Sequence, residues 1–308
     1  MPQEETFSKY TAAQGKHYAA VRPDYHTSVY DFVLEHTRFG PSTLAVDLGC
    51  GPGNVARALA PHFARVVGVD PADGMLETAT QISLDAKNVV YRKGTASDFD
   101  LLIAETDATD ATASTGSPVF IDLIASGNAA HWFDMPSFWP LAARVVRPGG
   151  TVALWTTGGL SIHPATVAAT QVQAIMDDYE DKLEPYMNDG NRVVRDGYQD
   201  LLKPWDAGVM AFPQEQYVRK EWTTDEQFLQ VGTMQADMPT MEKIMSTSSP
   251  YTRWCETHPS LKGTEQDLLR LVRRKVEAVQ QAAGVEPGKE SVRGLSLGAV
   301  LIFKKALK

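Results

Sequence analysis

A glycine-rich stretch near the start of the chain constrains the fold more than any other sequence feature. Residues 46–54 read VDLGCGPGN, so an apolar run leads directly into the alternating glycines Gly49, Gly51 and Gly53. Because glycine lacks a Cβ atom and adopts left-handed backbone conformations, such a loop can turn sharply and approach a ligand closely. Loops of this kind join a strand to a helix in open α/β sheets and hold a nucleoside cofactor.

The spacing of the glycines separates two classes of cofactor. A dinucleotide site requires G-x-G-x-x-G, in which the third glycine lets the pyrophosphate-binding helix pack closely. Asn54 occupies that third position. The G-x-G-x-G spacing suits S-adenosylmethionine, which has no phosphate and needs a bare backbone around its amino-acid tail. Asp70 ends the next expected strand and can accept both hydroxyls of a ribose, which is common to both cofactors.

Short apolar segments alternate with helical patterns in the first half of the chain. A helix capped by Thr27 or Ser28 is expected to end at Gly40, and the polar segment 104–117 is expected to be a mobile surface loop. Strands separated by helices indicate βαβ units and a mostly parallel sheet. The expected strands are 43–48, 65–69, 89–91, 119–125 and 151–155, with a turn at 147–150 and helices at 54–62 and from 73 onward.

The alternation of strands and helices stops after Trp155. Residues 156–290 contain several helical patterns and many aromatic side chains. The best-marked helix is predicted from a capping box at Thr264 and Asp267 to a stop at Gly284. Two later segments, 218–222 and 295–303, have the pattern of strands.

The composition of the chain limits the classes of partner and the location that we expect for the protein. A formal net charge of −9 over 308 residues argues against binding to nucleic acid or to anionic membranes. No apolar run reaches the length of a membrane-spanning helix, and the acidic segment MPQEETFSKY does not resemble a signal peptide. The only cysteines are Cys50 and Cys255, and no Cys/His cluster has metal-ligand spacing. We therefore expect a reducing, cytoplasmic location and no metal, and the sequence leaves the oligomeric state open.

Four motifs together resemble those of class I S-adenosylmethionine-dependent methyltransferases. They read VDLGCGPGN, GVDPADGML, DLIASGNAAHWFD and VVRPGGTVALW, and the likeness extends over about residues 15–155. The segments YAAVRPDY and AHWFD make the chain similar to the trans-aconitate methyltransferase-like group, which is well populated in fungi.

This resemblance implies an α/β fold with a Rossmann-like, seven-stranded sheet whose last strand is antiparallel to the others. Residues 295–303 are the candidate for that strand. A mainly helical insertion would then cap the carboxyl ends of the strands, where open α/β sheets bind ligands. The implied parts are an N-terminal helical lid at 1–40, a cofactor-binding core at 41–155, a substrate cap with late sheet strands at 156–290, and a C-terminal strand at 291–308.

The resemblance also assigns residues to the cofactor. Asp47 would orient the glycine loop or the ammonium group, and Arg22 would bind a carboxylate of the cofactor or the acceptor, with a surface salt bridge equally open. Met75 would flank the adenine, although its helical spacing fits a core position as well. Ser97 stands where the family has an acid that reads the adenine, with Asp98 directly after it. The predicted cofactor-binding residues are Tyr18, Arg22, Asp47, Gly49, Gly51, Asp70, Pro71, Met75, Ala96, Ser97, Ser126 and Asn128.

His131 is the candidate catalytic residue. A neutral histidine near the methyl group could deprotonate a hydroxyl or a thiol, but the favoured role is structural, to fix the turn that carries Trp132. The candidates for substrate contact are Tyr25, Trp132, Arg253 and Trp254.

The expected activity is methyl transfer from S-adenosylmethionine to a small molecule, with S-adenosylhomocysteine as the other product. Oxygen, in a carboxylate or a hydroxyl, is the favoured atom. Two alternatives stay open: a protein that keeps the cofactor fold but acts through a ligand or partner without methyl transfer, and an NAD-dependent oxidoreductase.

Overall fold

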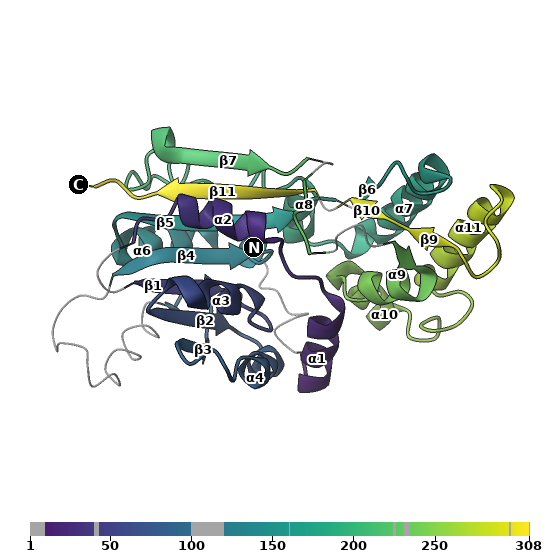
Figure 1. The fold of residues 1–308 in the computed structure, drawn as a ribbon, viewed down its shortest axis with the longest axis horizontal. Helices are drawn as coiled ribbons and strands as arrows, with labels where there is room; N and C mark the ends of the chain where they lie inside the picture. The colour runs from purple at the N-terminus through teal and green to yellow at the C-terminus, as the bar shows by residue number, and fades with distance from the viewer. Residues whose placement is uncertain are drawn as a thin grey trace.

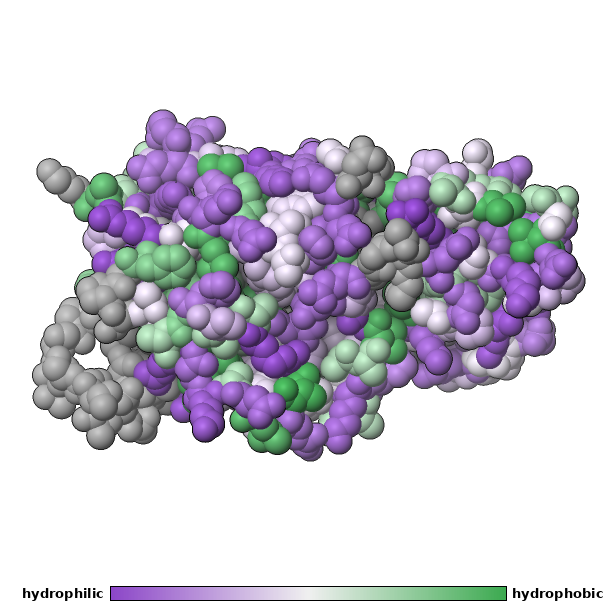
Figure 2. Space-filling model, in the orientation of Figure 1, coloured by the Kyte–Doolittle hydropathy of each residue, from purple (hydrophilic) through white to green (hydrophobic). Residues whose placement is uncertain are grey.

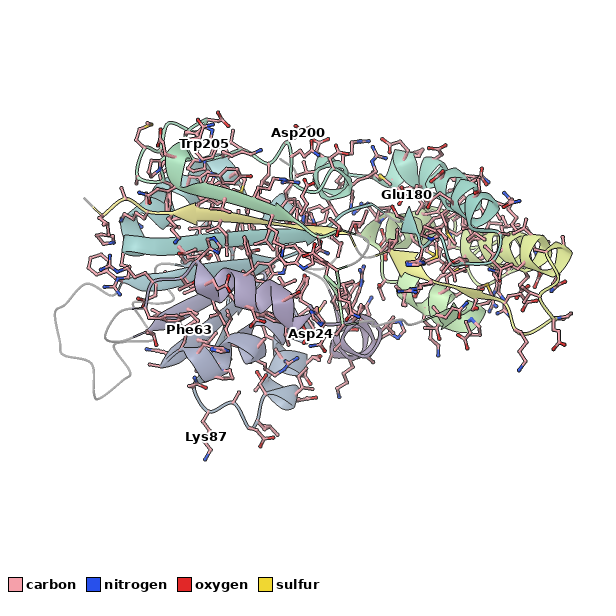
Figure 3. All side chains as sticks on the ribbon, turned by 45° about the horizontal axis from the view of Figure 1, so that its top comes forward. Asp24, Phe63, Lys87, Glu180, Asp200 and Trp205 are labelled. Carbon is pink, nitrogen blue, oxygen red and sulfur yellow. The ribbon has the colours of Figure 1, made fainter. Side chains whose placement is uncertain are left out.

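The computed structural model describes residues 10–39, 43–99, 120–159, 161–223, 226–230, 235–295 and 297–307. Figure 1 shows an elongated molecule in which a sheet with its covering helices lies beside a smaller helical unit. In Figure 3, Phe63 and Lys87 mark the sheet part, whereas Glu180 marks the helical unit. The predicted loop at 104–117 lies outside the described residues.

The sheet has seven strands. The first five in sequence are mutually parallel and β11 is antiparallel to both of its neighbours, which confirms the predicted fold class. In spatial order the strands are β3 (Val89–Lys93), β2 (Arg65–Asp70), β1 (Leu44–Leu48), β4 (Ile121–Gly127), β5 (Val146–Thr157), β11 (Gly298–Lys304) and β7 (Tyr217–Glu221).

Helices cover both faces of the sheet because alternate side chains of its strands are apolar on each side. On one face, α2 (Thr27–Glu35) and α3 (Asn54–Leu59) share a core with Leu123, Trp155 and Val300. On the other face, α6 (Met135–Val145) packs with a second core around Ile124 and Leu301. The short 3₁₀ turns η1 (Ala60–His62), η2 (Ala130–Trp132), η3 (Glu184–Tyr186) and η4 (Gln214–Gln216) lie in the connections.

The first helix, α1 (Ala12–Val21), packs against α4 (Asp73–Ile82) through glycines. A Cβ on Gly15 would lie 2.5 Å from the carbonyl oxygen of Gly74, and a Cβ on Gly74 would lie 2.3 Å from that of Tyr10. Since no side chain fits between them, the two backbones touch directly, which holds the N-terminal segment beside α4.

The helical unit has a core of its own. Its helices are α7 (Ala169–Leu183), α9 (Met238–Met245), α10 (Ser249–Thr257) and α11 (Leu268–Ala282), which enclose Met176, Trp254 and Val276. Helix α8 (Asp189–Arg195) packs against η2 and β5. Two short antiparallel pairs, β6 (Ser161–Ile162) with β10 (Gly294–Leu295) and β8 (Ala236–Asp237) with β9 (Ser291–Val292), complete the described elements.

Several predicted boundaries are wrong. Leu295 pairs with Ser161 in the small β6–β10 ribbon, and the final sheet strand begins at Gly298. Helix α11 is capped by Asp267 itself, which accepts a 2.9 Å hydrogen bond from the backbone nitrogen of Leu269. Residues 147–150 belong to β5 and do not form a separate turn before it. The pairing of β5 with β4 shifts register there, between Ile121 and Leu123 of β4.

The predicted N-cap of α2, Thr27 or Ser28, is also wrong. His26 is the N-cap, and its Nδ1 accepts from the backbone nitrogen of Ser28 at 3.2 Å. The helix ends at Glu35, and Gly40 lies outside the described residues. The error arose because histidine is not a usual capping residue and its imidazole acceptor takes the place of a hydroxyl or carboxylate.

Figure 2 shows a face that is mostly hydrophilic, with apolar residues scattered over it. In the described part of the chain, every helix is too short or too polar to cross a membrane.

Candidate active site

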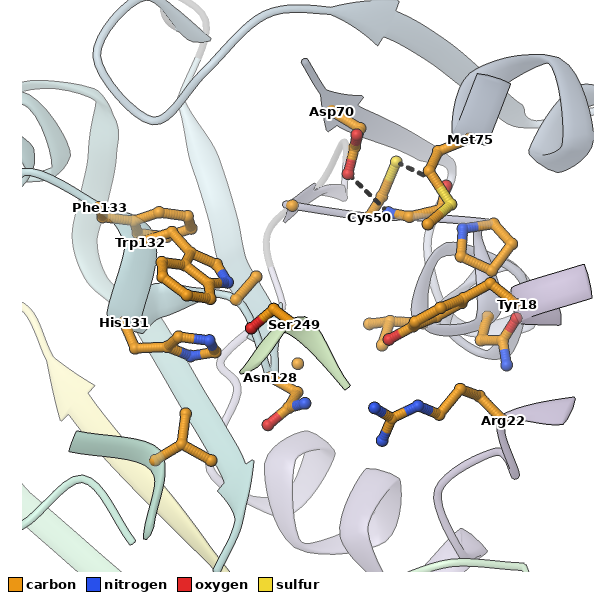
Figure 4. Close-up of a pocket in the computed structure, with 18 of the residues that line it drawn as sticks. Tyr18, Arg22, Cys50, Asp70, Met75, Asn128, His131, Trp132, Phe133 and Ser249 are labelled. Atoms are coloured by element: carbon orange, nitrogen blue, oxygen red, sulfur yellow. Dashed lines mark hydrogen bonds between the residues drawn. The ribbon is translucent and has the colours of Figure 1, made fainter. Parts of the chain in front are cut away.

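A cavity of about 620 Å³ lies at the carboxyl ends of the parallel strands. Its walls come from the loops after β1, β2, β3 and β4, from the N-terminal segment and from the helical unit (Figure 4). Ten of the twelve residues predicted to bind a cofactor line it, namely Tyr18, Arg22, Gly49, Gly51, Asp70, Pro71, Met75, Ala96, Ser97 and Asn128.

The glycine loop presents bare backbone to this cavity. Gly49, Gly51 and Gly53 have φ values of +68°, +51° and +81°, a region that favours glycine. A Cβ on Gly49 would lie 2.4 Å from the Cβ of Ala129, whereas a Cβ on Gly51 would meet nothing within 4 Å. The loop is therefore closed on one side by protein and open on the other, as a cradle for a ligand requires.

Asp70 ties the glycine loop to the start of α4. Its Oδ2 accepts from the backbone nitrogen of Gly51 and its Oδ1 from that of Ala72, both at 2.9 Å. Each carboxylate oxygen can accept a further hydrogen bond, and the residue lines the cavity, so the predicted grip on a diol is geometrically available. Burial raises the pKa of Asp70 to about 6, an effect that the two backbone donors oppose.

Asp47 and Ser126 do not line the cavity. Asp47 is fully buried, and its Oδ2 accepts from the backbone nitrogen of Ala56 at 3.0 Å, so it caps α3, whose N-cap Gly53 has no side chain. Burial raises the pKa of Asp47 to about 8. Its role in orienting the loop fits this position, whereas contact of its side chain with a ligand does not. The Ser126 side chain is likewise buried inside the sheet.

At the adenine end of the predicted site, Met75 and Ser97 both line the cavity. Asp98, the alternative to Ser97, is occupied elsewhere, because its Oδ1 accepts from the backbone nitrogen and the hydroxyl of Thr95 at 2.6 Å and 2.8 Å. Of the two polar residues left open by the sequence, Ser97 is the one that borders the cavity.

At the other end, polar side chains from distant segments converge. Figure 4 shows Arg22, Asn128, His131 and Ser249 around the same space. The Oδ1 of Asn128 accepts from the hydroxyl of Thr156 at 2.8 Å, which leaves its amide nitrogen as a donor for the cavity.

Arg22 keeps its terminal nitrogens available at this end. Its Nε donates to the hydroxyl of Thr247 at 2.9 Å, and its guanidinium lies 5.4 Å from the ring centroid of Tyr18. Within the described ranges no carboxylate forms an ion pair with it, so the structure does not support the open alternative of a surface salt bridge.

His131 lies in η2 with 4% of its surface exposed. Its Nδ1 is 2.8 Å from the hydroxyl of Tyr198, and no other side-chain hydrogen bond of the ring is found in the described part of the chain. Burial lowers the pKa of His131 to about 3, so the ring is neutral near pH 7.

Residues 46–154 match the family model described as "Methyltransferase domain", which spans the glycine loop, Asp70 and β5. These residues form a class I S-adenosylmethionine-dependent methyltransferase domain. A Dictyostelium discoideum protein named as a methyltransferase is 29% identical over 65% of this chain and 68% of its own length. Saccharomyces cerevisiae CRG1, named as an S-adenosylmethionine-dependent methyltransferase, is 24% identical over 80% of this chain and 82% of its own.

The solved structures agree on the fold of this methyltransferase. A structure titled as a type II methyltransferase from Anaeromyxobacter dehalogenans superposes with a TM-score of 0.59 and 23% identity, over 93% of this chain and 98% of the other. The likeness extends through the helical unit, so this unit belongs to the shared architecture.

The cavity of the methyltransferase fits its cofactor. The cradle leaves room only for bare backbone at Gly49 and is open at Gly51, and Asp70 offers unused acceptor capacity beside it. Tyr18 and Met75 supply apolar walls between these polar points. In the described part of the chain, no group of three His, Cys, Asp or Glu side chains is placed to hold a metal ion.

Two of the predicted substrate contacts were misplaced. Arg253 does not line the cavity, because its Nε donates to the carbonyl of Tyr186 at 2.7 Å and its Nη2 to Asn191 Oδ1 at 2.6 Å. Trp254 is buried in the core of the helical unit, stacked on Tyr251 and His258. The other two candidates, Tyr25 and Trp132, line the cavity.

Sequence reasoning missed Asn191, Ser249 and Tyr198. No motif marks the first or the last. The run Ser248-Ser249-Pro250 at the start of α10 is a helix-start signal, but it does not place the buried Ser249 beside the cavity.

Proposed function

We propose that this methyltransferase methylates an oxygen atom of a small organic molecule bound at the His131 end of the cavity. The observation that carries the proposal is the convergence of hydrogen-bond donors there: Arg22 Nη, Asn128 Nδ2 and the hydroxyl of Ser249. Donors stabilise an oxygen nucleophile, because such an atom presents lone pairs and often a negative charge. The cavity volume falls in the range of small-molecule sites.

The same cavity is poorly suited to a cationic amine. The carboxylates that line its described walls are Asp70, which lies at the cofactor end, and Asp134, which is exposed and accepts from the hydroxyl of Ser137. An ammonium group at the His131 end would therefore meet donors and a guanidinium instead of acceptors.

The chain contributes orientation to this reaction. The bound cofactor supplies a methyl group on a positively charged sulfur. Tyr25, Trp132 and Phe133 form apolar walls that exclude water from the space between the two ends of the cavity. Arg22, Asn128 and Ser249 fix the acceptor, and such alignment of reactants is worth up to about 7–11 kcal/mol in favourable cases.

A reducing compartment is part of the same proposal. Cys50 and Cys255 are both free and buried. Cys50 lies in the loop that forms the cofactor cradle, where oxidation would interfere with binding.

Incubation with cofactor carrying a labelled methyl group, and with a panel of organic acids, alcohols, phenols, amines and thiols, tests the proposal. Label is expected in an ester or ether product, and in much smaller amount at low cofactor concentration with the Asp70→Asn variant, which is expected to bind cofactor weakly. Label in amine products only would overturn the choice of oxygen. Binding of S-adenosylhomocysteine without label in any product would favour a protein that acts without methyl transfer.

A further inference from the structure

We propose that Tyr198 is a positioning residue, whose hydroxyl donates to Nδ1 of His131 and thereby holds the imidazole as an Nε2–H donor facing the cavity. This assigns His131 a role as donor instead of base. The conclusion about the acceptor, given below, rests on the proposed function, whereas the assignment of the tautomer does not.

The backbone conformation of Tyr198 is energetically costly. The residue is fully buried and has φ of +64°, directly after Gly197 at +62°. An aromatic residue in the left-handed region is a genuine outlier, and such strain gathers at functional sites. The backbone nitrogen of Tyr198 donates to the carbonyl of Val193 at 2.9 Å, so the end of α8 closes the turn that aims the side chain inward.

The segment that carries Tyr198 also packs closely against the backbone of η2. Gly190 in α8 lies so close that a Cβ would be 2.7 Å from the carbonyl oxygen of His131 and 2.9 Å from the Trp132 ring. The stretch 189–198 therefore touches His131 twice, at its carbonyl through Gly190 and at its ring through Tyr198. This double contact fixes the orientation of the imidazole.

The separation of 2.8 Å fits either direction of this hydrogen bond, and we assign the phenol hydroxyl as its donor. A phenol hydroxyl is a good donor, and the unprotonated nitrogen of a neutral imidazole is a good acceptor. Burial raises the pKa of Tyr198 and lowers that of His131 to about 3, so both groups are neutral near pH 7. A neutral imidazole has one N–H and one lone pair. Since Nδ1 accepts from Tyr198, Nε2 must carry the proton, and the ring borders the cavity (Figure 4).

An Nε2–H group cannot accept a proton from the acceptor molecule. With His131 removed as a base, the proposal favours a nucleophile that arrives already ionised, which a carboxylate does at pH 7 and an alcohol or ordinary phenol does not. In the transfer, a lone pair of the carboxylate oxygen forms the new O–C bond, and the electrons of the breaking C–S bond go to sulfur. An anion and a sulfonium become a neutral ester and a thioether, and no proton moves.

Nitrogen-15 NMR of the histidine rings tests the tautomer without any acceptor. The protein labelled at histidine nitrogens is studied with S-adenosylhomocysteine at neutral pH, and the His131 signals among the seven histidines are assigned by their loss in His131→Gln. We expect a protonated Nε2 and a hydrogen-bonded, unprotonated Nδ1. A proton on Nδ1 would overturn the proposal.

Tyr198→Phe removes only the hydroxyl. We expect His131 to become a mixture of tautomers in this variant, and kcat for a carboxylate acceptor to fall about tenfold with the affinity for S-adenosylhomocysteine unchanged. Tyr30→Phe is the matched control, because Tyr30 is also buried and its hydroxyl donates to Asp24 at 2.9 Å away from the cavity. An unchanged His131 tautomer in Tyr198→Phe would contradict the role of Tyr198.

The pH profile separates donor from base. With an ionised acceptor and an Nε2–H donor, kcat for a carboxylate is expected to be level between pH 6 and 8. A rising limb in this range that disappears in His131→Gln would show that the ring takes a proton and would overturn the proposal. If no acceptor is methylated, the proposed function fails, and the NMR result still decides on the tautomer.

Discussion

The two ends of the cavity are built in different ways. At the cofactor end, consecutive loops after β1 and β2 supply backbone groups and one carboxylate, Asp70, within a stretch of about thirty residues. At the acceptor end, the side chains come from residues as distant as Arg22, His131, Asn191 and Ser249. The first end is made by local chain geometry and the second by packing between separate parts of the molecule.

This difference teaches where substitutions should act. A change at the cofactor end alters backbone conformation or a charged acceptor, so it should affect binding of every cofactor analogue. A change at the acceptor end alters one side chain among several donors, so it should affect turnover or one part of a ligand. The four predictions below go from the largest to the smallest expected effect.

Gly49→Ala is expected to have the largest effect. Its Cβ would lie 2.4 Å from that of Ala129, in a backbone with φ of +68°. Because Ala129 belongs to the η2 side of the cavity, relief of the clash must displace the cradle. We expect affinity for S-adenosylhomocysteine, measured by calorimetry, to fall about 100-fold or more.

Gly208→Ala is the control for backbone strain alone. Gly208 has φ of +74°, but a Cβ there would meet nothing within 4 Å, and the residue does not line the cavity. It should lose about 1 kcal/mol of stability and bind the ligand normally. Equal binding by both variants would show that the glycine loop is not the cradle.

Asp70→Asn is expected to lower the affinity for S-adenosylhomocysteine about 10- to 100-fold, because the predicted charged acceptor of the ribose hydroxyls becomes neutral. With a pKa of about 6, Asp70 is ionised above that pH and protonated below it. Affinity of the unchanged protein should therefore fall as the pH drops from 7 to 5. The Asn variant should not show this fall.

Asp73→Asn serves as the neighbouring control. Its carboxylate is exposed and pairs with Lys93 at the start of α4, so the variant should bind as the unchanged protein does at every pH. A loss of pH dependence in Asp73→Asn, and not in Asp70→Asn, would remove Asp70 from the cofactor site.

The cofactor end of the cavity was also easier to predict from the sequence than the acceptor end. The alternation of strands and helices could be predicted, because periodicity is a local property of the chain. The antiparallel C-terminal strand and most of the ten predicted cofactor residues that line the cavity followed from the resemblance of four motifs to a known family. Element boundaries such as Leu295 failed, since pairing with β6 depends on a partner more than a hundred residues away.

The acceptor end could be predicted only in part for the same reason. Tyr25, His131 and Trp132 lie next to recognisable motifs. Arg253 and Trp254 had the right chemistry, but hydrogen bonding to Asn191 and stacking in the helical unit use their side chains. Residue type alone cannot separate a side chain that faces a cavity from one that supports such a side chain.

Arg22→Gln decides between the two ligands left open for this guanidinium. If Arg22 binds the cofactor carboxylate, the variant should bind S-adenosylhomocysteine about tenfold more weakly. Its affinity for 5′-methylthioadenosine, which lacks the amino-acid tail, should be unchanged. If Arg22 binds the acceptor, both ligands should keep their affinity and KM for the acceptor should rise. Equal weakening of both ligands would point to displacement of Tyr18, on whose ring the guanidinium lies.

Asp47→Asn is expected to have the smallest effect on ligand binding. It tests whether the buried carboxyl group of Asp47 destabilises the folded protein when it is ionised. The pKa of Asp47 is raised from 3.8 to about 8, so the folded state binds an extra proton between these values, and stability contributed by this group falls as the pH rises from 4 to 8. Asparagine can still accept from Ala56, so the variant should be more stable than the unchanged protein at pH 9, by about 1–2 kcal/mol in urea unfolding, and little different at pH 5. The control is Asp85→Asn at an exposed position, which should not change stability differently at pH 5 and pH 9.

An Asp47→Asn variant that is less stable than the unchanged protein at pH 9 would contradict the prediction. It would mean that the ionised carboxylate of Asp47 stabilises the loop by more than its burial costs.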